Sequence, residues 1–171
     1  VKYFYSKKKE KIPTGTCLIL ITPDFRSEKQ FSDIKADLMA WKKRSRSVGQ
    51  VHAGFRGEVD KLWADIRVSL GRKGGRDIYV CGHSLGGAMA TICASRLRED
   101  DKGNVKALYT YGSPKVGGKL FVWNLDELEH YRFVNNNDMV TRVPLWIMGY
   151  RHHGNLTYIN HYGRSEERRV G

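Results

Sequence analysis

The stretch DIYVCGHSLGGAMATICASRL at 77–97 joins a short run of strand-forming residues directly to a longer run with good helix propensity. At the junction lies GHSLGG (82–87), in which Gly82, Ser84 and Gly86 fit the pattern G-x-S-x-G. A sharp strand-to-helix turn lifts a serine above the edge of a sheet and strains its backbone, and the flanking glycines remove Cβ atoms that would clash. The stretch therefore predicts a nucleophile elbow. The alternative is an ordinary turn in which the serine caps the helix.

The expected helix after Ser84 bears on the chemistry of that serine. Its first N–H groups and the positive end of its dipole point to the place where an oxyanion would form, so the backbone N–H of Leu85 is a candidate oxyanion donor. Gly86 and a second glycine, Gly87, complete the elbow motif. We expect His83 to pack or hydrogen-bond beneath the elbow.

Strand-like and helix-like runs alternate along the chain, which is typical of a mainly parallel sheet covered by helices. Apolar residues at helical spacing predict a long helix over 54–70, which ends at a glycine-rich run. The other expected elements are strands at 16–21, 77–82, 104–112 and 131–136, helices at 33–41 and 119–129, and a hairpin within 149–160. The predicted fold class is α/β.

The composition indicates one folded domain. The 171 residues are 40% hydrophobic, and no apolar run approaches the ~18 residues that a membrane helix needs. No signal-peptide pattern opens the chain, which favours a cytoplasmic location, although a targeting segment lost ahead of Val1 stays open. The three cysteines, Cys17, Cys81 and Cys93, are expected to be buried free thiols, and no Cys/His spacing suggests a metal site.

The net charge of +12 comes largely from two basic clusters, KKKEK at 7–11 and KKRSR at 42–46. Such clusters can attract anionic lipid surfaces or nucleic acid. The alternative is a solvated surface, which is the favoured interpretation of such charge runs. Neither cluster is interleaved with aromatic residues, as a platform for single-stranded nucleic acid would be.

Several motifs occur in one order: VHAGF (51–55), the elbow stretch, LYTYGSPKVG (108–117) and YRFVNNNDMVTRVP (131–144), preceded by FSDIKADL (31–38). In this order they resemble the central block of the class 3 lipases, a branch of the α/β-hydrolases. The resemblance implies an α/β-hydrolase fold, with a mainly parallel sheet and helices on both faces. It also implies hydrolysis of lipid or small carboxylic esters through an acyl-enzyme on Ser84, with no metal or cofactor. Peripheral contact with an anionic membrane surface is a further expectation, and nucleic acid is not expected as a partner.

The acid of the catalytic triad follows the serine along the chain in this fold. Asp138 meets that condition, because it lies on the loop that leaves the expected strand at 131–136. Its family counterpart orients the histidine and stabilises the imidazolium. A turn aspartate is the alternative, and Asp126 and Glu127 are weaker candidates because they fall within an expected helix.

The second oxyanion donor of the family is usually a Ser or Thr hydroxyl in an F-R-G-[ST] context. This chain has FRSEK at 25–29 instead. If the glycine has been lost, Ser27 supplies the hydroxyl. Without a gap, Glu28 occupies that position, where a carboxylate would repel the oxyanion. Ser27 is the preferred candidate.

The catalytic histidine has no clear position in this chain. His161 is the only late candidate, and the expected base lies on a loop beyond the chain end. The last residues, RSEERRVG (164–171), resemble a translated sequencing adapter, so the expected domain is 1–163 followed by a non-native tail. A genuine basic tail is the alternative. The absent base also motivates a second function, a catalytically dead module that binds anionic lipid surfaces.

Overall fold

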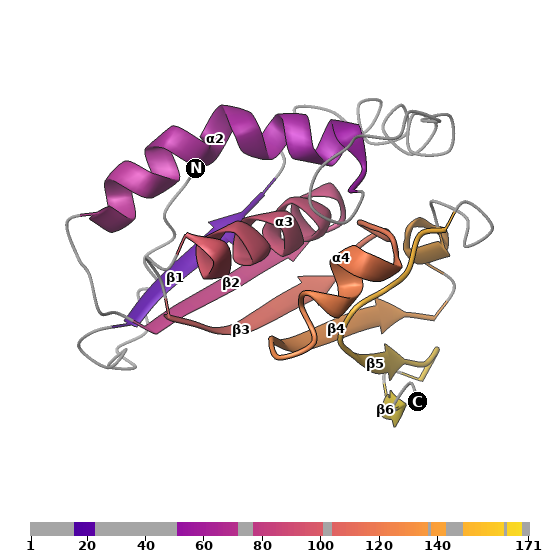
Figure 1. The fold of residues 1–171 in the computed structure, drawn as a ribbon. Coiled ribbons are helices and arrows are strands. Elements are labelled where there is room, and N and C mark those ends of the chain that lie inside the picture. Colours follow the sequence, from indigo (N-terminus) through magenta and orange to yellow (C-terminus); the bar gives the residue numbers. More distant parts are fainter. Residues whose placement is uncertain are drawn as a thin grey trace.

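The computed structural model describes residues 16–22, 51–71, 77–100, 104–136, 138–142, 149–162 and 164–168. Its centre is a six-stranded sheet whose strand order follows the chain order, β1 to β6 (Figure 1). The first five strands are parallel, and β6 is antiparallel to β5. The strands are β1 (Thr16–Ile21), β2 (Asp77–His83), β3 (Asn104–Tyr111), β4 (Glu129–Asn135), β5 (Asn155–Ile159) and β6 (Ser165–Arg168).

The described helices lie on one face of this sheet (Figure 1). Helix α3 contacts β1, β2 and β3, and α2 packs on α3 as an outer layer. The helices are α2 (Ala53–Gly71), α3 (Leu85–Glu99) and α4 (Lys119–Trp123), with one 3₁₀ turn, η1 (Met139–Arg142). This parallel sheet with covering helices confirms the predicted fold class. Within the described ranges, helices cover one face of the sheet where two were expected.

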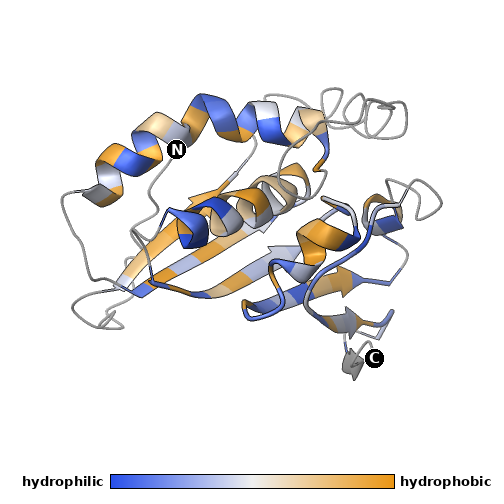
Figure 2. Cartoon of the chain, in the orientation of Figure 1, coloured by the Kyte–Doolittle hydropathy of each residue, from blue (hydrophilic) through white to orange (hydrophobic). Residues whose placement is uncertain are grey.

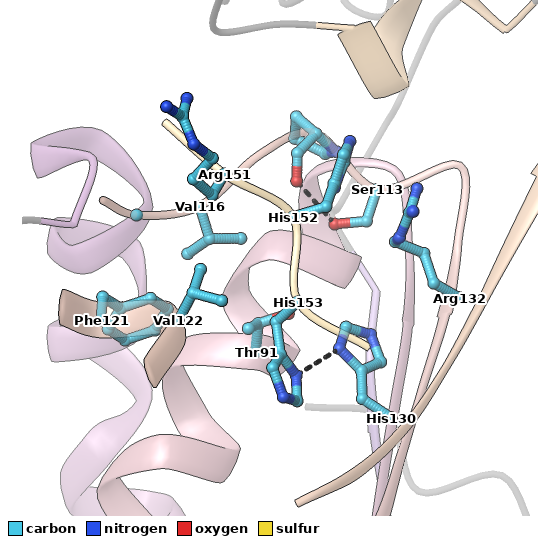
Figure 3. A pocket seen from close by; sticks show the side chains of 12 residues that line it. Thr91, Ser113, Val116, Phe121, Val122, His130, Arg132, Arg151, His152 and His153 are labelled. Carbon is cyan, nitrogen blue, oxygen red and sulfur yellow. Dashed lines mark hydrogen bonds between the residues drawn. The ribbon is translucent and has the colours of Figure 1, made fainter. Parts of the chain in front are cut away.

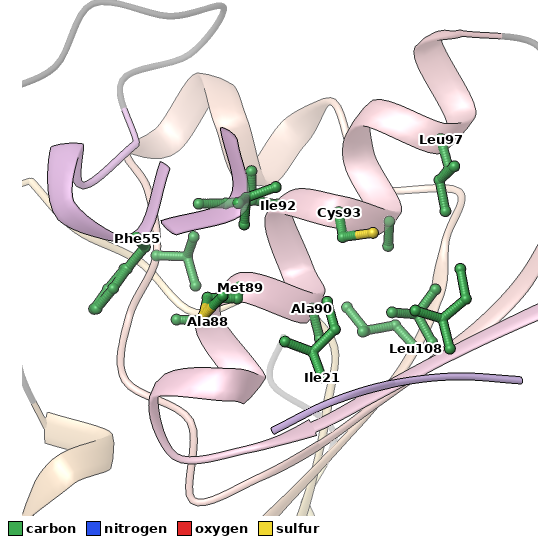
Figure 4. Packing of buried hydrophobic residues seen from close by; sticks show 14 of the residues in the cluster. Ile21, Phe55, Ala88, Met89, Ala90, Ile92, Cys93, Leu97 and Leu108 are labelled. Carbon is green, nitrogen blue, oxygen red and sulfur yellow. The ribbon is translucent and has the colours of Figure 1, made fainter. Parts of the chain in front are cut away.

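Helix α3 packs close to the sheet because its inner residues are small. Ala88, Ala90, Cys93 and Ala94 are almost fully buried, and Leu108 of β3 packs in the same cluster (Figure 4). Each fully buried leucine or isoleucine of such a core contributes about 1.5–3 kcal/mol to the free energy of unfolding. Figure 2 shows apolar residues along β1, β2 and α3, whereas polar residues are frequent on α2. The core thus anchors the strand and the helix that flank Ser84.

The other face of the sheet carries aromatic residues in cross-strand pairs. Tyr109 stacks on Tyr131 with ring centroids 5.2 Å apart, and Tyr111 stacks on Phe133 at 4.9 Å. Such pairs contribute about 0.5–1.5 kcal/mol beyond their buried area. They fix β3 against β4, which places the ends of these two strands next to each other.

The expected hairpin within 149–160 is wrong. Strand β5 pairs in parallel with β4, and the segment before it crosses to Gly117, where the Arg151 N–H donates to the Gly117 carbonyl at 2.8 Å. Gly149 and Gly154 have φ of +84° and +89°, so the chain turns at both ends of this segment instead of pairing with itself.

Other expectations differ in detail. The helix expected at 119–129 ends at Trp123, after which the chain continues in turns. Only Cys93 among the free cysteines is buried, whereas Cys17 and Cys81 are half-buried. The helix expected at 33–41 lies outside the described residues. The backbone of Ser165–Arg168 pairs with β5, and the assignment of 164–171 as a non-native tail stays a prediction. In the described residues, no helix combines the length and apolar character needed to cross a membrane.

Candidate active site

Ser84 occupies a strained turn between β2 and α3. Its φ of +53° and ψ of −125° make it the only non-glycine residue with positive φ in the described part of the chain. Such a conformation costs about 1–3 kcal/mol and persists only where the surroundings impose it. Here the Ser84 N–H donates to the Tyr111 carbonyl (2.8 Å), and the Ser84 carbonyl accepts from the Gly87 N–H (2.9 Å). The turn is therefore fixed to β3 on one side and to α3 on the other.

The Ser84 side chain is not used as a helix cap. Ser84 stands at the N-cap position of α3, yet its hydroxyl makes no capping hydrogen bond. A serine N-cap normally accepts a hydrogen bond from one of the first helical N–H groups. The geometry therefore favours the elbow over the ordinary capped turn. Ser84 is 3% exposed, so it lies within the protein and not on an open edge.

Two glycines allow this close turn. A Cβ on Gly82 would lie 2.2 Å from the Gly86 carbonyl oxygen and 2.8 Å from the Gly87 nitrogen. A Cβ on Gly87 would lie 2.8 Å from the Cβ of Ser113. The first turn of α3 thus rests directly on β2, and only hydrogen fits at position 82.

We predict that Gly82→Ala lowers the free energy of unfolding by about 3 kcal/mol or more, because the added methyl group meets backbone atoms that cannot move independently. Urea unfolding measures the effect. Gly57→Ala is the matched control, since nothing lies within 4 Å of a Cβ there and alanine favours α2 by about 0.5–1 kcal/mol. A Gly82→Ala protein as stable as the parent would contradict the described packing.

Of the candidate oxyanion donors, only Leu85 lies within the described residues. Leu85 is the first residue of α3, so its N–H belongs to the first four that have no acceptor within the helix. This N–H adjoins Ser84 at the positive end of the helix dipole. Ser27 and Glu28, the alternatives for the second donor, lie outside the described residues.

Asp138 caps the η1 turn just after β4. Its Oδ1 accepts from the Val140 N–H at 3.0 Å, its own N–H donates to the Asn135 carbonyl at 2.8 Å, and its carbonyl accepts from the Thr141 hydroxyl at 2.8 Å. An aspartate at this position satisfies N–H groups that the turn leaves without acceptors. Asp138 is therefore held by two backbone hydrogen bonds and by one through Oδ1, while Oδ2 takes part in none of the three.

Oδ2 of Asp138 lies against the end of β3. Gly112 follows that strand with φ of +57°, and a Cβ there would lie 2.5 Å from Asp138 Oδ2 and 3.9 Å from His83 Nε2. Asp138 follows β4 and Ser84 follows β2, and β3 lies between these two strands. A carboxylate directed at the end of β3 is therefore directed toward the side of the sheet on which Ser84 lies. His83 is exposed at the end of β2, so the expectation that it packs beneath the elbow is wrong. Sequence reasoning missed Gly112, although a glycine directly after a strand was a visible signal.

A basic cluster, made of buried His130 and Arg132 and half-buried His152 and His153, lines a pocket between α3, α4 and β4 (Figure 3). His130 Nε2 is hydrogen-bonded to the Thr110 hydroxyl (2.8 Å), and His130 Nδ1 is hydrogen-bonded to His153 Nδ1 (3.1 Å). Arg132 is 6% exposed, burial lowers its pKa to about 10, and its Nε has no hydrogen-bond partner within the described structure. No functional role was predicted for this cluster.

His152 connects that cluster to η1. Its Nε2–H donates to the Thr141 carbonyl at 2.6 Å. Burial, followed by the nearby positive charge of Arg132, lowers the pKa of His152 to about 3. The imidazole is therefore neutral at ordinary pH, with its single proton on Nε2.

We predict that the free energy of unfolding falls as the pH drops from about 6.5 toward 3. Burial lowers the pKa of His130, His152 and His153 in the folded chain below the unfolded value, so the unfolded chain binds more protons in this window. For His152 the slope is about 1.4 kcal/mol per pH unit. Urea unfolding at several pH values measures it.

The matched comparison for this prediction is His152→Gln, which has no imidazole to protonate. Its stability should depend less steeply on pH than that of the parent between about pH 6.5 and 3. Equal slopes in the two proteins would contradict the prediction, because they would place the acid sensitivity in other groups.

The late histidine does not complete a triad. His161 is exposed, and its ring packs on Tyr162 with centroids 3.6 Å apart. No interaction between described residues joins it to Ser84 or Asp138. The general base is therefore not identified among the histidines that the structure describes.

A parallel sheet in which β2 is followed at once by a strained serine, with a carboxylate after β4 two strands away, is typical of the α/β-hydrolase class. Within that class, residues 24–148 match the family Lipase (class 3). This chain belongs to the class 3 lipase family.

Individual relatives agree with this assignment. Toxin TseL of Vibrio cholerae is 39% identical over 57% of this chain and 15% of its own length. Secreted mono- and diacylglycerol lipase 1 of Fusarium solani is 38% identical over 60% of this chain and 32% of its own. The crystal structure of the lipase from Rhizopus microsporus var. chinensis superposes with a TM-score of 0.69 at 26% identity, covering 86% of this chain and 54% of that one.

The comparison with these relatives also concerns the length of the chain and its expected location. The chain spans between 15% and 38% of the length of the first curated proteins it matches. The expected cytoplasmic location is wrong, because relatives such as the Fusarium solani enzyme are secreted lipases.

Proposed function

We propose that this protein hydrolyses carboxylic esters of acylglycerols through an acyl-enzyme on Ser84. The observation that carries the proposal is the strained backbone of Ser84, whose hydroxyl is left out of helix capping at the N-terminus of α3. Strain of this kind is kept where it serves a reaction. The family and its named mono- and diacylglycerol lipases supply the substrate class.

The reaction assigns one task to each group. Ser84 Oγ bonds to the ester carbonyl carbon while its proton passes to a histidine, and the departing alkoxide takes that proton as its bond to carbon breaks. Water then attacks the acyl-enzyme by the same route and releases the fatty acid and free Ser84. The Leu85 N–H, with the Ser27 hydroxyl as second donor, stabilises the oxyanion. Asp138 orients the histidine and stabilises its positive charge.

A lipid surface is the place where these substrates are found. The charge of +12 supports an attraction of the protein to anionic lipid. Both basic clusters, 7–11 and 42–46, lie outside the described residues, so this contact rests on charge alone. Replacing these lysines and arginines should weaken binding to anionic vesicles and leave turnover of a soluble ester unchanged.

Labelling with an alkyl fluorophosphonate tests the proposal, because this probe reacts with a serine only where a base and an oxyanion site activate it. The experiment uses the full-length protein, and mass spectrometry should find the adduct on the peptide that contains Ser84. Absence of labelling in a folded protein would overturn the proposal and leave the lipid-binding module without catalysis as the better account.

A further inference from the structure

The η1 turn, which carries Asp138 at its start, depends on two side chains from other parts of the fold. His152 Nε2–H donates to the Thr141 carbonyl at 2.6 Å, and Lys115 Nζ donates to the Arg142 carbonyl at 2.8 Å. These are the last two carbonyls of a four-residue turn, which has too few residues to satisfy them internally. Two of the hydrogen bonds that position η1 therefore come from donors outside it.

His152 is linked to Asp138 by hydrogen bonds through a single intervening residue. Its imidazole donates to the carbonyl of Thr141, and the hydroxyl of Thr141 donates to the carbonyl of Asp138 at 2.8 Å. Val140 and Thr141 are buried, which holds one side of η1 against the protein, whereas Met139 is 70% exposed and Arg142 is exposed. Two successive hydrogen bonds therefore run from His152 to the backbone of the proposed acid.

His152 is itself firmly placed. The preceding residue, Arg151, is bonded through its N–H to the Gly117 carbonyl, and the following residue, His153, is stacked on His130 with ring centroids 5.2 Å apart. Figure 3 shows His152 and His153 on the segment that passes over α3. A neutral imidazole between two anchored neighbours is a donor whose position and protonation do not change at ordinary pH.

We propose that His152 is a positioning residue that holds Asp138 in register with the end of β3, acting through Thr141. The inference rests on the proposed function, because it gives Asp138 the role of the triad acid. A catalytic group must be held within about 0.5 Å of its working geometry, and a misplacement of about 1 Å can cost on the order of a hundredfold in rate. A single 3₁₀ turn cannot supply such precision alone.

Steady-state kinetics on the full-length protein test this inference. His152→Phe keeps a ring of similar size and removes the donor, and kcat per labelled serine should fall by about tenfold to a hundredfold with KM within about twofold. His152→Gln returns an N–H donor and should recover kcat to within about threefold. The matched control is His153→Phe, which alters the same cavity but no bond to η1, and its kcat should stay within about threefold.

A variant on the same route covers the case in which His152→Phe does not fold. Thr141→Val keeps the shape of the side chain and removes the hydroxyl that donates to Asp138, so kcat should again fall by about tenfold or more with KM unchanged. Unchanged kcat in Thr141→Val or in a folded His152→Phe protein would overturn the proposal. Equal losses in His152→Phe and His153→Phe would do so too, since they would indicate general damage to the cavity.

A double-mutant cycle distinguishes a failure of the positioning role of His152 from a failure of the proposed catalytic role of Asp138. With Asp138→Asn already present, His152→Phe should lower kcat by less than about twofold further, because the group it positions no longer carries charge. Full additivity of the two losses would overturn the positioning role. Full activity of Asp138→Asn alone would instead overturn the role of Asp138 in the proposed function, whatever His152→Phe does.

Discussion

Alanine in place of Ser84 is expected to lower kcat for ester hydrolysis by about 10⁶-fold in the full-length protein, with loss of fluorophosphonate labelling. Removing the nucleophile of a serine hydrolase removes nearly all the catalysis that its triad provides. Alanine tolerates a positive φ no better than serine, so the strain at φ of +53° stays and the free energy of unfolding should change by less than about 1 kcal/mol. Turnover of a short-chain p-nitrophenyl ester and a urea titration measure the two quantities.

Glycine at the same position gives a contrasting variant. Ser84→Gly should be equally inactive but more stable than the parent by about 1 kcal/mol, because glycine adopts positive φ without strain. An inactive protein that gains stability would show that the turn is kept at a cost for catalysis. Retained labelling in Ser84→Ala would place the reactive serine elsewhere and contradict the assignment.

Asp138→Asn is expected to lower kcat by about 10⁴-fold with little change in KM. An amide cannot stabilise the imidazolium that forms when the histidine takes the serine proton, and it favours the wrong tautomer of that histidine. The amide oxygen can still accept the hydrogen bond from the Val140 N–H, so the η1 turn should keep its cap. The loss would therefore report the missing charge and not a displaced loop. Single-turnover kinetics of acylation measure it.

The control for Asp138→Asn is Asp126→Asn. Asp126 is a weaker candidate for the acid, is exposed, and lies in the turns after α4. Its replacement should leave kcat within about twofold of the parent. A large loss at Asp126 with normal activity in Asp138→Asn would reverse the assignment of the acid.

Local sequence patterns predict much of the fold. The strand at 16–21 has the observed bounds, and the helix expected at 54–70 is observed as Ala53–Gly71. Apolar periodicity decides such elements, because one buried side is enough to select a helix or a strand. Lys119–Trp123 is shorter than expected, since its apolar run continues into turns held by tertiary packing of Leu125 and Leu128.

The elbow is also predictable from the sequence, for a related reason. A strand, a G-x-S-x-G junction and a helix follow one another within 77–97, so the strained turn and its glycines are properties of adjacent residues. The structure adds the distances, such as the 2.2 Å that a Cβ on Gly82 would leave to the Gly86 oxygen. The candidate acid required the family resemblance, because one aspartate after a strand resembles any turn aspartate.

The sequence by itself determined the first four strands, the two long helices and the turn that displays Ser84, because each depends on residues close together in the chain. Only the tertiary structure decided that β5 pairs with β4, that Asp138 is directed at Gly112, and that His152 binds Thr141. These contacts join segments that are distant along the chain. Their geometry depends on how the sheet, the helices and the basic cluster pack together, and no local pattern records that.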